Sequence, residues 1–266
     1  MSDQVTLHIA DRVGWITIDR PEKKNAFTQE MMKGLLEILG RLEHEKAAEV
    51  VVVRAAGGDF CSGADVGALS QNGQSTPQDR AAGFERALDT TIQPLLRAWL
   101  NLPQPVIASA RGYVIGLGMQ FVLAADLVVA SRTSKFLLNN VKLGHVTDHG
   151  ESWLLPRRIG PSKALEMCLV GDVLSAADAE RFGIANWLTD DADLETKTGE
   201  IVAKLLRGAP FALRQAKALL RDSAVNDFEQ QMQAERSRVA ACAASDDFAE
   251  AMQALQARRA PQPVSA

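Results

Sequence analysis

Length, composition and charge exclude several classes of protein for this chain. It has 266 residues, of which 29 are basic and 33 acidic, and its formal net charge is −4. This mild acidity argues against general attraction to nucleic acid or to anionic membranes. Three cysteines without a C-x-x-C spacing (Cys61, Cys168 and Cys242) indicate a reducing compartment and no zinc site. With no secretory signal or membrane-spanning run in the sequence, we expect a cytoplasmic protein.

The N-terminal half predicts strands that alternate with helices. Segments 5–9 and 13–19 are rich in β-branched residues and alternate in polarity, which indicates two paired strands. Thr28 is the expected N-cap of a helix with apolar residues at helical spacing (Met31, Leu35, Ile38 and Leu42). Further strands, buried on both faces, are predicted at 50–53, 106–110 and 127–130. This order indicates an α/β architecture with parallel pairing.

Later segments predict mainly helices. We expect a surface segment at 71–78 and a long helix at 84–102, kinked at Pro94. From Glu151 onward helical patterns dominate, at 152–158, 163–169, 176–182, 194–206, 211–220, 227–241 and 248–258. We therefore expect a core with the active site over residues 1–195 and a helical C-terminal region over residues 196–266.

Two loops, each following a predicted strand, are candidates for binding negative charge. Residues 59–66 hold small side chains before a short helix, although a plain strand–helix connection explains them as well. Residues 111–120 are glycine-rich, but Phe121 stands where a dinucleotide fingerprint needs its third glycine. Together the two loops can donate one backbone N–H each, as an oxyanion hole requires.

A third loop, 143–153, holds four titratable side chains: His145, Asp148, His149 and Glu151. One hypothesis is a site of proton transfer. The other is a capping box, with Asp148 as the N-cap of the following helix and Glu151 reaching back to it.

Several ordered motifs resemble the crotonase (enoyl-CoA hydratase/isomerase) family. The segment 58–65, Gly-Asp-Phe-Cys-Ser-Gly-Ala-Asp, resembles the motif around the first oxyanion donor. The run 105–108 with Gly112-Tyr113 and Gly116-Leu117-Gly118 resembles the second. Arg20-Pro21 with Asn25-Ala26 resembles the segment that lies along CoA. The similarity extends from about Val5 to Arg259.

The resemblance implies an α/β, crotonase-like spiral of ββα units with a helical C-terminal trimerisation region, forming a homotrimer or a dimer of trimers. It implies an acyl-CoA thioester as substrate, no separate cofactor and no metal. The N–H groups of Ala64 and Leu117 would form the oxyanion hole. The implied substrate- or CoA-binding residues are Lys23, Lys24, Ala26, Ala64, Asp65, Val66, Gly67, Gly116, Leu117, Gln120, Asn140 and His145.

The chain departs from the hydratases of this family at two positions. Gln120 and Asn140 stand where hydratases carry glutamates, and amides cannot give or take a proton at working pH. Asp148 aligns with the aspartate of the isomerase branch, which includes the ring-opening epoxide isomerase of phenylacetyl-CoA breakdown and enoyl-CoA isomerases. One carboxylate can move a proton between two carbons, and we expect burial to raise its pKa.

Four hypotheses follow. The leading one is a double-bond or ring isomerase with Asp148 as proton shuttle. The second is a hydrolytic or dehalogenase-like enzyme that uses Asp148 with His145 or His149. The third is an atypical hydratase using Glu151 or Asp148, and the fourth is an inactive CoA-binding or RNA-binding relative. We interpret the basic residues of the C-terminal region as a solvated helix face (Lys204, Arg207, Arg214, Lys217 and Arg221).

Overall fold

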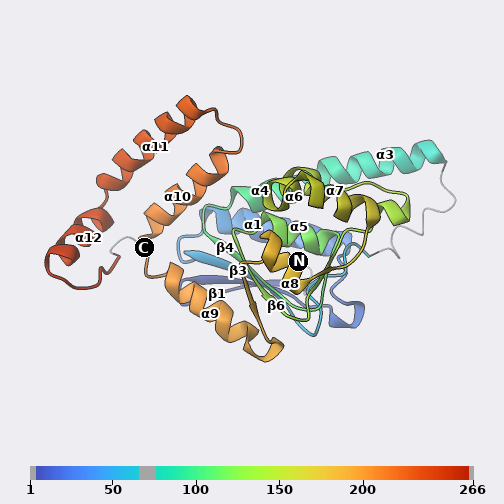
Figure 1. Ribbon diagram of the computed structural model, residues 1–266, viewed down its shortest axis with the longest axis horizontal. Coiled ribbons are helices and arrows are strands. Elements are labelled where there is room, and N and C mark those ends of the chain that lie inside the picture. Colours follow the sequence, from blue (N-terminus) through green and yellow to red (C-terminus); the bar gives the residue numbers. More distant parts are fainter. Residues whose placement is uncertain (1–3, 66–75, 264–266) are drawn as a thin grey trace.

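Two sheets form the centre of the computed structural model, which describes residues 4–65 and 76–263. The larger sheet has the strand order β1-β2-β3-β4-β6-β9 (Figure 1). Its strands are β1 (Val5–Ala10), β2 (Val13–Ile18), β3 (Val50–Ala55), β4 (Val106–Ala110), β6 (Leu127–Ser131) and β9 (Trp187–Thr189). Only β1 and β2 pair antiparallel, and every other pair in this sheet is parallel. The expected α/β class with parallel pairing is confirmed.

The smaller sheet consists of β5 (Tyr113–Ile115), β7 (Lys135–Leu137) and β8 (Leu174–Ser175). Strands β5 and β7 pair parallel, and β7 and β8 pair antiparallel. The sequence did not predict these strands, because two or three residues are too few for a pattern of alternation to stand out. They matter here because β5 lies within the second glycine-rich segment, 111–120, directly before Gly116.

The burial of strand β3 shows that the larger sheet is covered on both faces. Val50, Val51, Val52 and Val53 are all fully buried, as the continuous apolar run predicts. Successive side chains point to opposite faces of a strand. Val51 and Val53 accordingly join the main hydrophobic core, while Val50 and Val52 join a second cluster.

Helices close both faces of this sheet. On the main face lies α1 (Gln29–His44), with Met31, Leu35, Ile38 and Leu42 buried. The Thr28 hydroxyl accepts a hydrogen bond from Met31 N at 3.2 Å, so the predicted N-cap is confirmed. On the opposite face, Leu194, Ile201 and Val202 of α9 (Leu194–Leu205) pack into the second cluster.

The long helix expected at 84–102 is three elements. They are α3 (Pro77–Ala87), a π-helical turn η2 (Leu88–Ile92) and α4 (Gln93–Asn101). Pro94 is the second residue of α4, directly after the π-helical turn, and its ring nitrogen carries no hydrogen to donate to the preceding turn. Residues 71–75 of the expected surface segment lie outside the described residues. Residues 76–78 begin α3, because Thr76 and Asp79 form a capping box.

The helices expected in the last part of the chain are all present. They are α6 (Glu151–Ile159), α7 (Pro161–Val170), α8 (Ala176–Phe182), α9, α10 (Pro210–Asp222), α11 (Phe228–Ala243) and α12 (Asp246–Gln256). The fully buried α5 (Leu117–Ala124) follows β5. Short 3-10 turns are η1 (Pro21–Lys23), η3 (Asn140–Leu143) and η4 (Asp191–Asp193).

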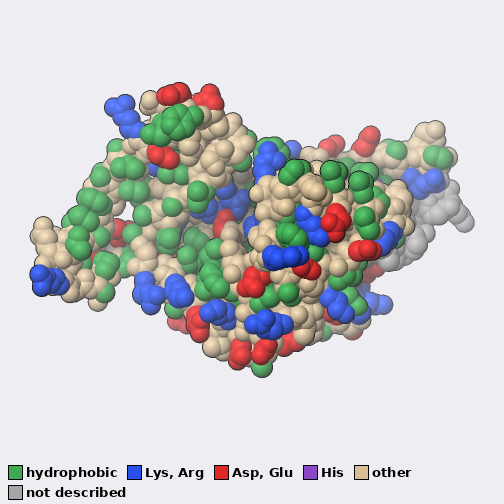
Figure 2. Space-filling view, in the orientation of Figure 1, with side chains coloured by type: hydrophobic (Ala, Val, Ile, Leu, Met, Phe, Trp, Pro, Cys, Tyr) green, Lys and Arg blue, Asp and Glu red, His purple; other side chains and the backbone are tan. Residues whose placement is uncertain are grey.

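Helices α10, α11 and α12 lie to one side of the sheets (Figure 1). Apolar side chains on α11 and α12 are exposed, and the space-filling view shows hydrophobic atoms over this region (Figure 2). They include Phe228, Met232, Val239, Phe248, Met252 and Leu255. The trimer or dimer of trimers stays a prediction, as does the division at residue 195, which falls inside α9.

Two of the basic residues on α10 are structural. Lys217 Nζ and Arg221 Nη2 lie 2.7 and 2.6 Å from the two carboxylate oxygens of Asp126. The Lys217 side chain is only 8% exposed. The interpretation of these two residues as a solvated face is therefore wrong, since they anchor α10 to the start of β6. Within the described ranges, no helix combines the length and the apolarity needed to cross a membrane.

Candidate functional site

The two glycine-rich loops lie side by side. Cys61 N donates to Tyr113 O, and Ile115 N donates to Cys61 O, each at 2.9 Å. These bonds form a parallel bridge between Cys61 and Val114. Segments far apart in the sequence are thereby held in one register by backbone hydrogen bonds.

Gly112 makes this close approach possible. Its φ is +59°, and a Cβ built there would lie 2.1 Å from Gly58 O and 2.4 Å from Asp59 Oδ1. No side chain fits in that space, and the backbone conformation itself favours glycine. The Asp59 carboxylate closes the contact by accepting a hydrogen bond from Tyr113 N at 2.9 Å.

The bridge between Ala64 and Phe27 uses neither backbone group of Ala64, so its N–H does not bond to Phe27. Phe27 N donates to Gly63 O, and Asp65 N donates to Phe27 O, both at 2.9 Å. In a parallel bridge of this kind, one residue uses both its backbone groups while the residue opposite uses neither. Among the described residues, no acceptor for Ala64 N–H is present.

Leu117 presents a second N–H that has no acceptor among the described residues. It is the first residue of α5, whose N-cap Gly116 provides no side-chain cap. N–H groups in the first turn have no partner inside the helix and carry its positive dipole end. A Cβ built on Gly116 would lie 3.7 Å from Gly63 Cα. The residues that precede the two candidate donors are therefore in contact.

The early segment implied to lie along CoA borders the first loop. Ser62 N donates to Lys24 O at 3.0 Å, and Ser62 Oγ donates to Lys23 O at 3.4 Å. Ala26 O accepts from Arg20, whose guanidinium also pairs with Asp65 at 2.7 Å. Lys23, Lys24, Ala26, Ala64 and Asp65 are thus brought together, while Val66 and Gly67 lie outside the described residues.

Asn25 holds this segment in place. Its side chain is fully buried; Oδ1 accepts from Arg20 N at 2.7 Å. Its Nδ2 donates to Ala56 O at 2.9 Å and to Asp59 O at 2.6 Å. The motif predicted that this residue matters, but these contacts show that its amide ties the early segment to the first loop.

The two amides that replace glutamates differ in their surroundings. Gln120 on α5 is 1% exposed, and both atoms of its amide lack a hydrogen-bond partner among the described residues. Asn140 Nδ2 donates to Val146 O at 3.1 Å, while its Oδ1 is buried without a partner. The described residues therefore leave hydrogen-bonding capacity unused on both amides.

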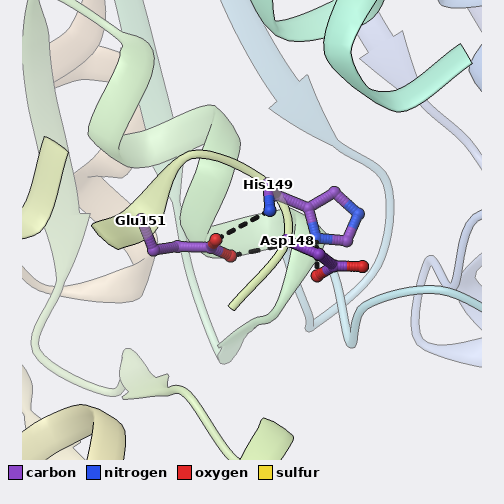
Figure 3. Close-up of side chains that lie close together, drawn as sticks. All are labelled: Asp148, His149 and Glu151. Atoms are coloured by element: carbon purple, nitrogen blue, oxygen red, sulfur yellow. Dashed lines mark hydrogen bonds and ion pairs between the residues drawn. The ribbon is translucent and has the colours of Figure 1, made fainter. Parts of the chain in front are cut away.

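Asp148, His149 and Glu151 converge at the start of α6, whose first residue is Glu151 (Figure 3). His149 Nδ1 lies 2.7 Å from Asp148 Oδ1 and 3.9 Å from Glu151 Oε1. His145 Nε2 lies 3.3 Å from the other oxygen of Asp148, and the His145 ring packs against Phe84 with centroids 5.0 Å apart. Asp148 therefore has one imidazole beside each of its carboxylate oxygens.

Asp148 is not the N-cap of α6, so the capping hypothesis is wrong for this residue. The N-cap is Gly150, with φ +82°, and it offers no side chain. Glu151 does reach back, because its Oε2 accepts a hydrogen bond from His149 N at 2.9 Å. Asp148 is thereby left to interact with the two histidines.

Burial and charge pull the pKa values of this cluster in opposite directions. Burial alone would raise the pKa of Asp148, but the hydrogen bond and charge of His149, with the charge of His145, hold it below its ordinary value. The expected rise is therefore wrong. Burial lowers the pKa of His149 less than Asp148 and Glu151 raise it, so the net shift is upward. Burial raises the pKa of Glu151, which is fully enclosed.

The same three residues are the candidate metal ligands of the described chain. Each offers one atom, and these atoms lie within 4.8 Å of one another. Hydrogen bonds and ion pairs inside the cluster account for this proximity, since the imidazole lies between two carboxylates. The absence of a bound metal stays a prediction.

Known proteins match the chain over nearly its whole length. The sequence profile described as Enoyl-CoA hydratase/isomerase matches residues 8–263. The 1,2-epoxyphenylacetyl-CoA isomerase of Escherichia coli (strain K12) is 30% identical, covering 98% of both chains. The (E)-benzylidenesuccinyl-CoA hydratase of Thauera aromatica is 30% identical, covering 80% of both.

Solved structures agree with this match. The enoyl-CoA hydratase from Bacillus anthracis superimposes with a TM-score of 0.90 at 26% identity, covering 99% of this chain and 100% of that one. The fold expected from the resemblance is thus confirmed, helical C-terminal part included. The chain belongs to the crotonase, or enoyl-CoA hydratase/isomerase, family.

Proposed function

We propose that the protein isomerises acyl-CoA thioesters, moving a double bond or opening a ring through an enolate. The N–H groups of Ala64 and Leu117 would hold the enolate oxygen. The observation that carries this proposal is that both N–H groups lack an acceptor in the described chain, although the loops that bear them are joined by hydrogen bonds. Two such donors would stabilise the oxyanion by roughly 3–4 kcal/mol each.

Asp148 would move the proton. It is ionised at neutral pH, because its pKa lies below the ordinary value. As a carboxylate it can take a proton from one carbon and, once protonated, return that proton to another. The amides Gln120 and Asn140 cannot share this task. With one carboxylate in place of a glutamate pair, isomerisation is favoured over addition of water.

The CoA part of the substrate would lie along the early segment. Lys23 and Lys24 are exposed there, next to the loop that carries Ala64. Lys24 Nζ also lies 4.5 Å from the ring centre of Tyr113, so this ammonium group contacts the second loop. Exposed ammonium groups suit the phosphates of CoA, and the thioester of a CoA bound there would lie toward the loop that carries Ala64.

A second candidate is the activation of water for hydrolysis or hydration. The observation that favours it is that both His145 and His149 lie within 3.3 Å of an Asp148 oxygen. An imidazole backed by a carboxylate is a general base. Glu151 does not favour the hydratase alternative, because its side chain is fully buried and bonded to His149 N.

The test is a reaction panel with three separate readouts. Purified protein is incubated with β,γ-enoyl-CoA and α,β-enoyl-CoA, and migration of the double bond, addition of water and release of free CoA are followed. Asp148→Asn should lower isomerisation at least a hundredfold. Asp190→Asn, which changes a 75% exposed carboxylate, is the matched control. Isomerisation undiminished in Asp148→Asn would refute the shuttle, and water addition or CoA release by the wild type would favour the second candidate.

A further inference from the structure

Gln120 is a buried side chain whose hydrogen-bonding groups are unused. It is 1% exposed, and neither Oε1 nor Nε2 has a partner in the described part of the chain. Its neighbours in α5, Met119 and Phe121, are buried apolar residues. A polar group enclosed in this way destabilises the protein unless something else binds it. A ligand that forms hydrogen bonds with such a group would offset this cost.

The position of Gln120 in α5 places this residue within one helical turn of the proposed donor Leu117. It lies three residues after Leu117, so both residues share one face of the helix. The separation along the helix axis is roughly 4.5 Å, at 1.5 Å per residue. An acyl chain whose carbonyl oxygen is held by Leu117 N–H would pass Gln120 with one of its first few carbons.

The chemistry of an amide limits what it can recognise there. Gln120 offers one acceptor oxygen and two N–H donors, and it carries no charge. A hydroxyl, carbonyl or epoxide oxygen can pair with it. A plain hydrocarbon chain would leave both of its polar atoms unpaired, and a carboxylate would be buried without compensation of its charge.

We propose that Gln120 is a specificity-determining residue that binds an uncharged oxygen function near the thioester end of the acyl chain. The preferred substrates are then oxygenated acyl-CoA thioesters rather than hydrocarbon ones. This inference rests on the proposed function, because it assumes a CoA thioester bound at Leu117 N–H. Sites that hydrogen-bond a substrate oxygen discriminate strongly against analogues that lack it, since their own polar groups then stay unpaired.

Calorimetric titration tests this without requiring turnover. The wild type is titrated with butyryl-CoA, with both enantiomers of 3-hydroxybutyryl-CoA and with 4-hydroxybutyryl-CoA. We expect at least one hydroxylated thioester to bind about ten- to a hundredfold more tightly than butyryl-CoA. Gln120→Met keeps the length of the side chain and removes its polar atoms. It should abolish this preference by weakening the hydroxylated ligand and strengthening butyryl-CoA.

Gln29→Met is the control, because Gln29 is exposed at the start of α1 and should leave every affinity unchanged. Equal affinities of the wild type for all four thioesters would overturn the role of Gln120 and leave the proposed function standing. So would a preference that survives in Gln120→Met. Failure of every thioester to bind would overturn the proposed function, and this inference with it.

Discussion

Replacing Gly112 with alanine should damage both the fold and the proposed oxyanion hole. The added Cβ would lie 2.1 Å from Gly58 O, in a backbone conformation with φ +59°. The left-handed conformation costs an alanine about 1–2 kcal/mol, and forcing two backbone segments apart costs about 1–3 kcal/mol more. Gly112→Ala should therefore lower the free energy of unfolding by about 2–5 kcal/mol.

Thermal unfolding is the direct measurement. For a chain of this size, such a loss lowers Tm by roughly 5–15 °C. Gly199→Ala is the matched control: Gly199 lies inside α9 with nothing within 4 Å of the added Cβ. There the same substitution should stabilise the protein by about 0.5–1 kcal/mol.

The activity of Gly112→Ala links this strain to the site. Separation of the loops would misalign Ala64 N–H against Leu117 N–H, and loss of one oxyanion donor lowers kcat by about 10²–10³. Activity should be measured well below the Tm of the variant, where it is folded. A variant with the Tm and kcat of the wild type would refute the argument that the close contact at Gly112 aligns the two donors.

Two predictions concern pH. Because burial raises the folded pKa of Glu151 above the ordinary 4.5, the free energy of unfolding should fall as pH rises from 4.5 through the raised value. Glu151→Gln should remove this fall. If urea denaturation gives the same change of unfolding free energy with pH for both proteins, the prediction is contradicted. Burial lowers the pKa of Lys217 to about 8 from 10.5, so the wild type should gain roughly 3 kcal/mol of stability between these pH values. Lys217→Met should show no such gain, and a rise that persists in it would assign the effect to another group.

Sequence patterns predicted the large elements of the fold because buried faces require apolar residues at regular spacing in the sequence. Val50–Val53 form a buried strand, and the residues Met31, Leu35, Ile38 and Leu42 form one face of α1. The strands of the smaller sheet are too short to show such a spacing. The π-helical turn at Leu88–Ile92 also has no distinct sequence signal, since it changes the hydrogen bonding of a continuous helical run.

The sequence predicted which residues form the candidate site, but it did not predict how their side chains interact. The motifs named Ala64, Leu117 and Asp148, but the pairing of Asp148 with His149 depends on how the chain turns at Gly150. The spacing of Asp148 and Glu151 suggests a side-chain cap, but the N-cap of α6 is Gly150, a glycine in the left-handed conformation. The two imidazoles lower the pKa of Asp148, whereas burial alone would raise it. The direction of the shift therefore could not be predicted from burial alone.

The two carboxylate oxygens of Asp148 are not equivalent, and this difference bears on the proposed chemistry. Oδ1 lies 2.7 Å from the buried His149, whereas Oδ2 lies 3.3 Å from His145, whose side chain is 39% exposed. The close approach and charge of the His149 imidazole at Oδ1 favour the ionised carboxylate. In the proposed mechanism, proton exchange with a substrate would fall to Oδ2 or to His145 beside it. The proposed proton shuttle and the water-activating alternative would then use the same edge of Asp148, and what would distinguish them is whether a carbon of the acyl chain or a water molecule reaches that edge.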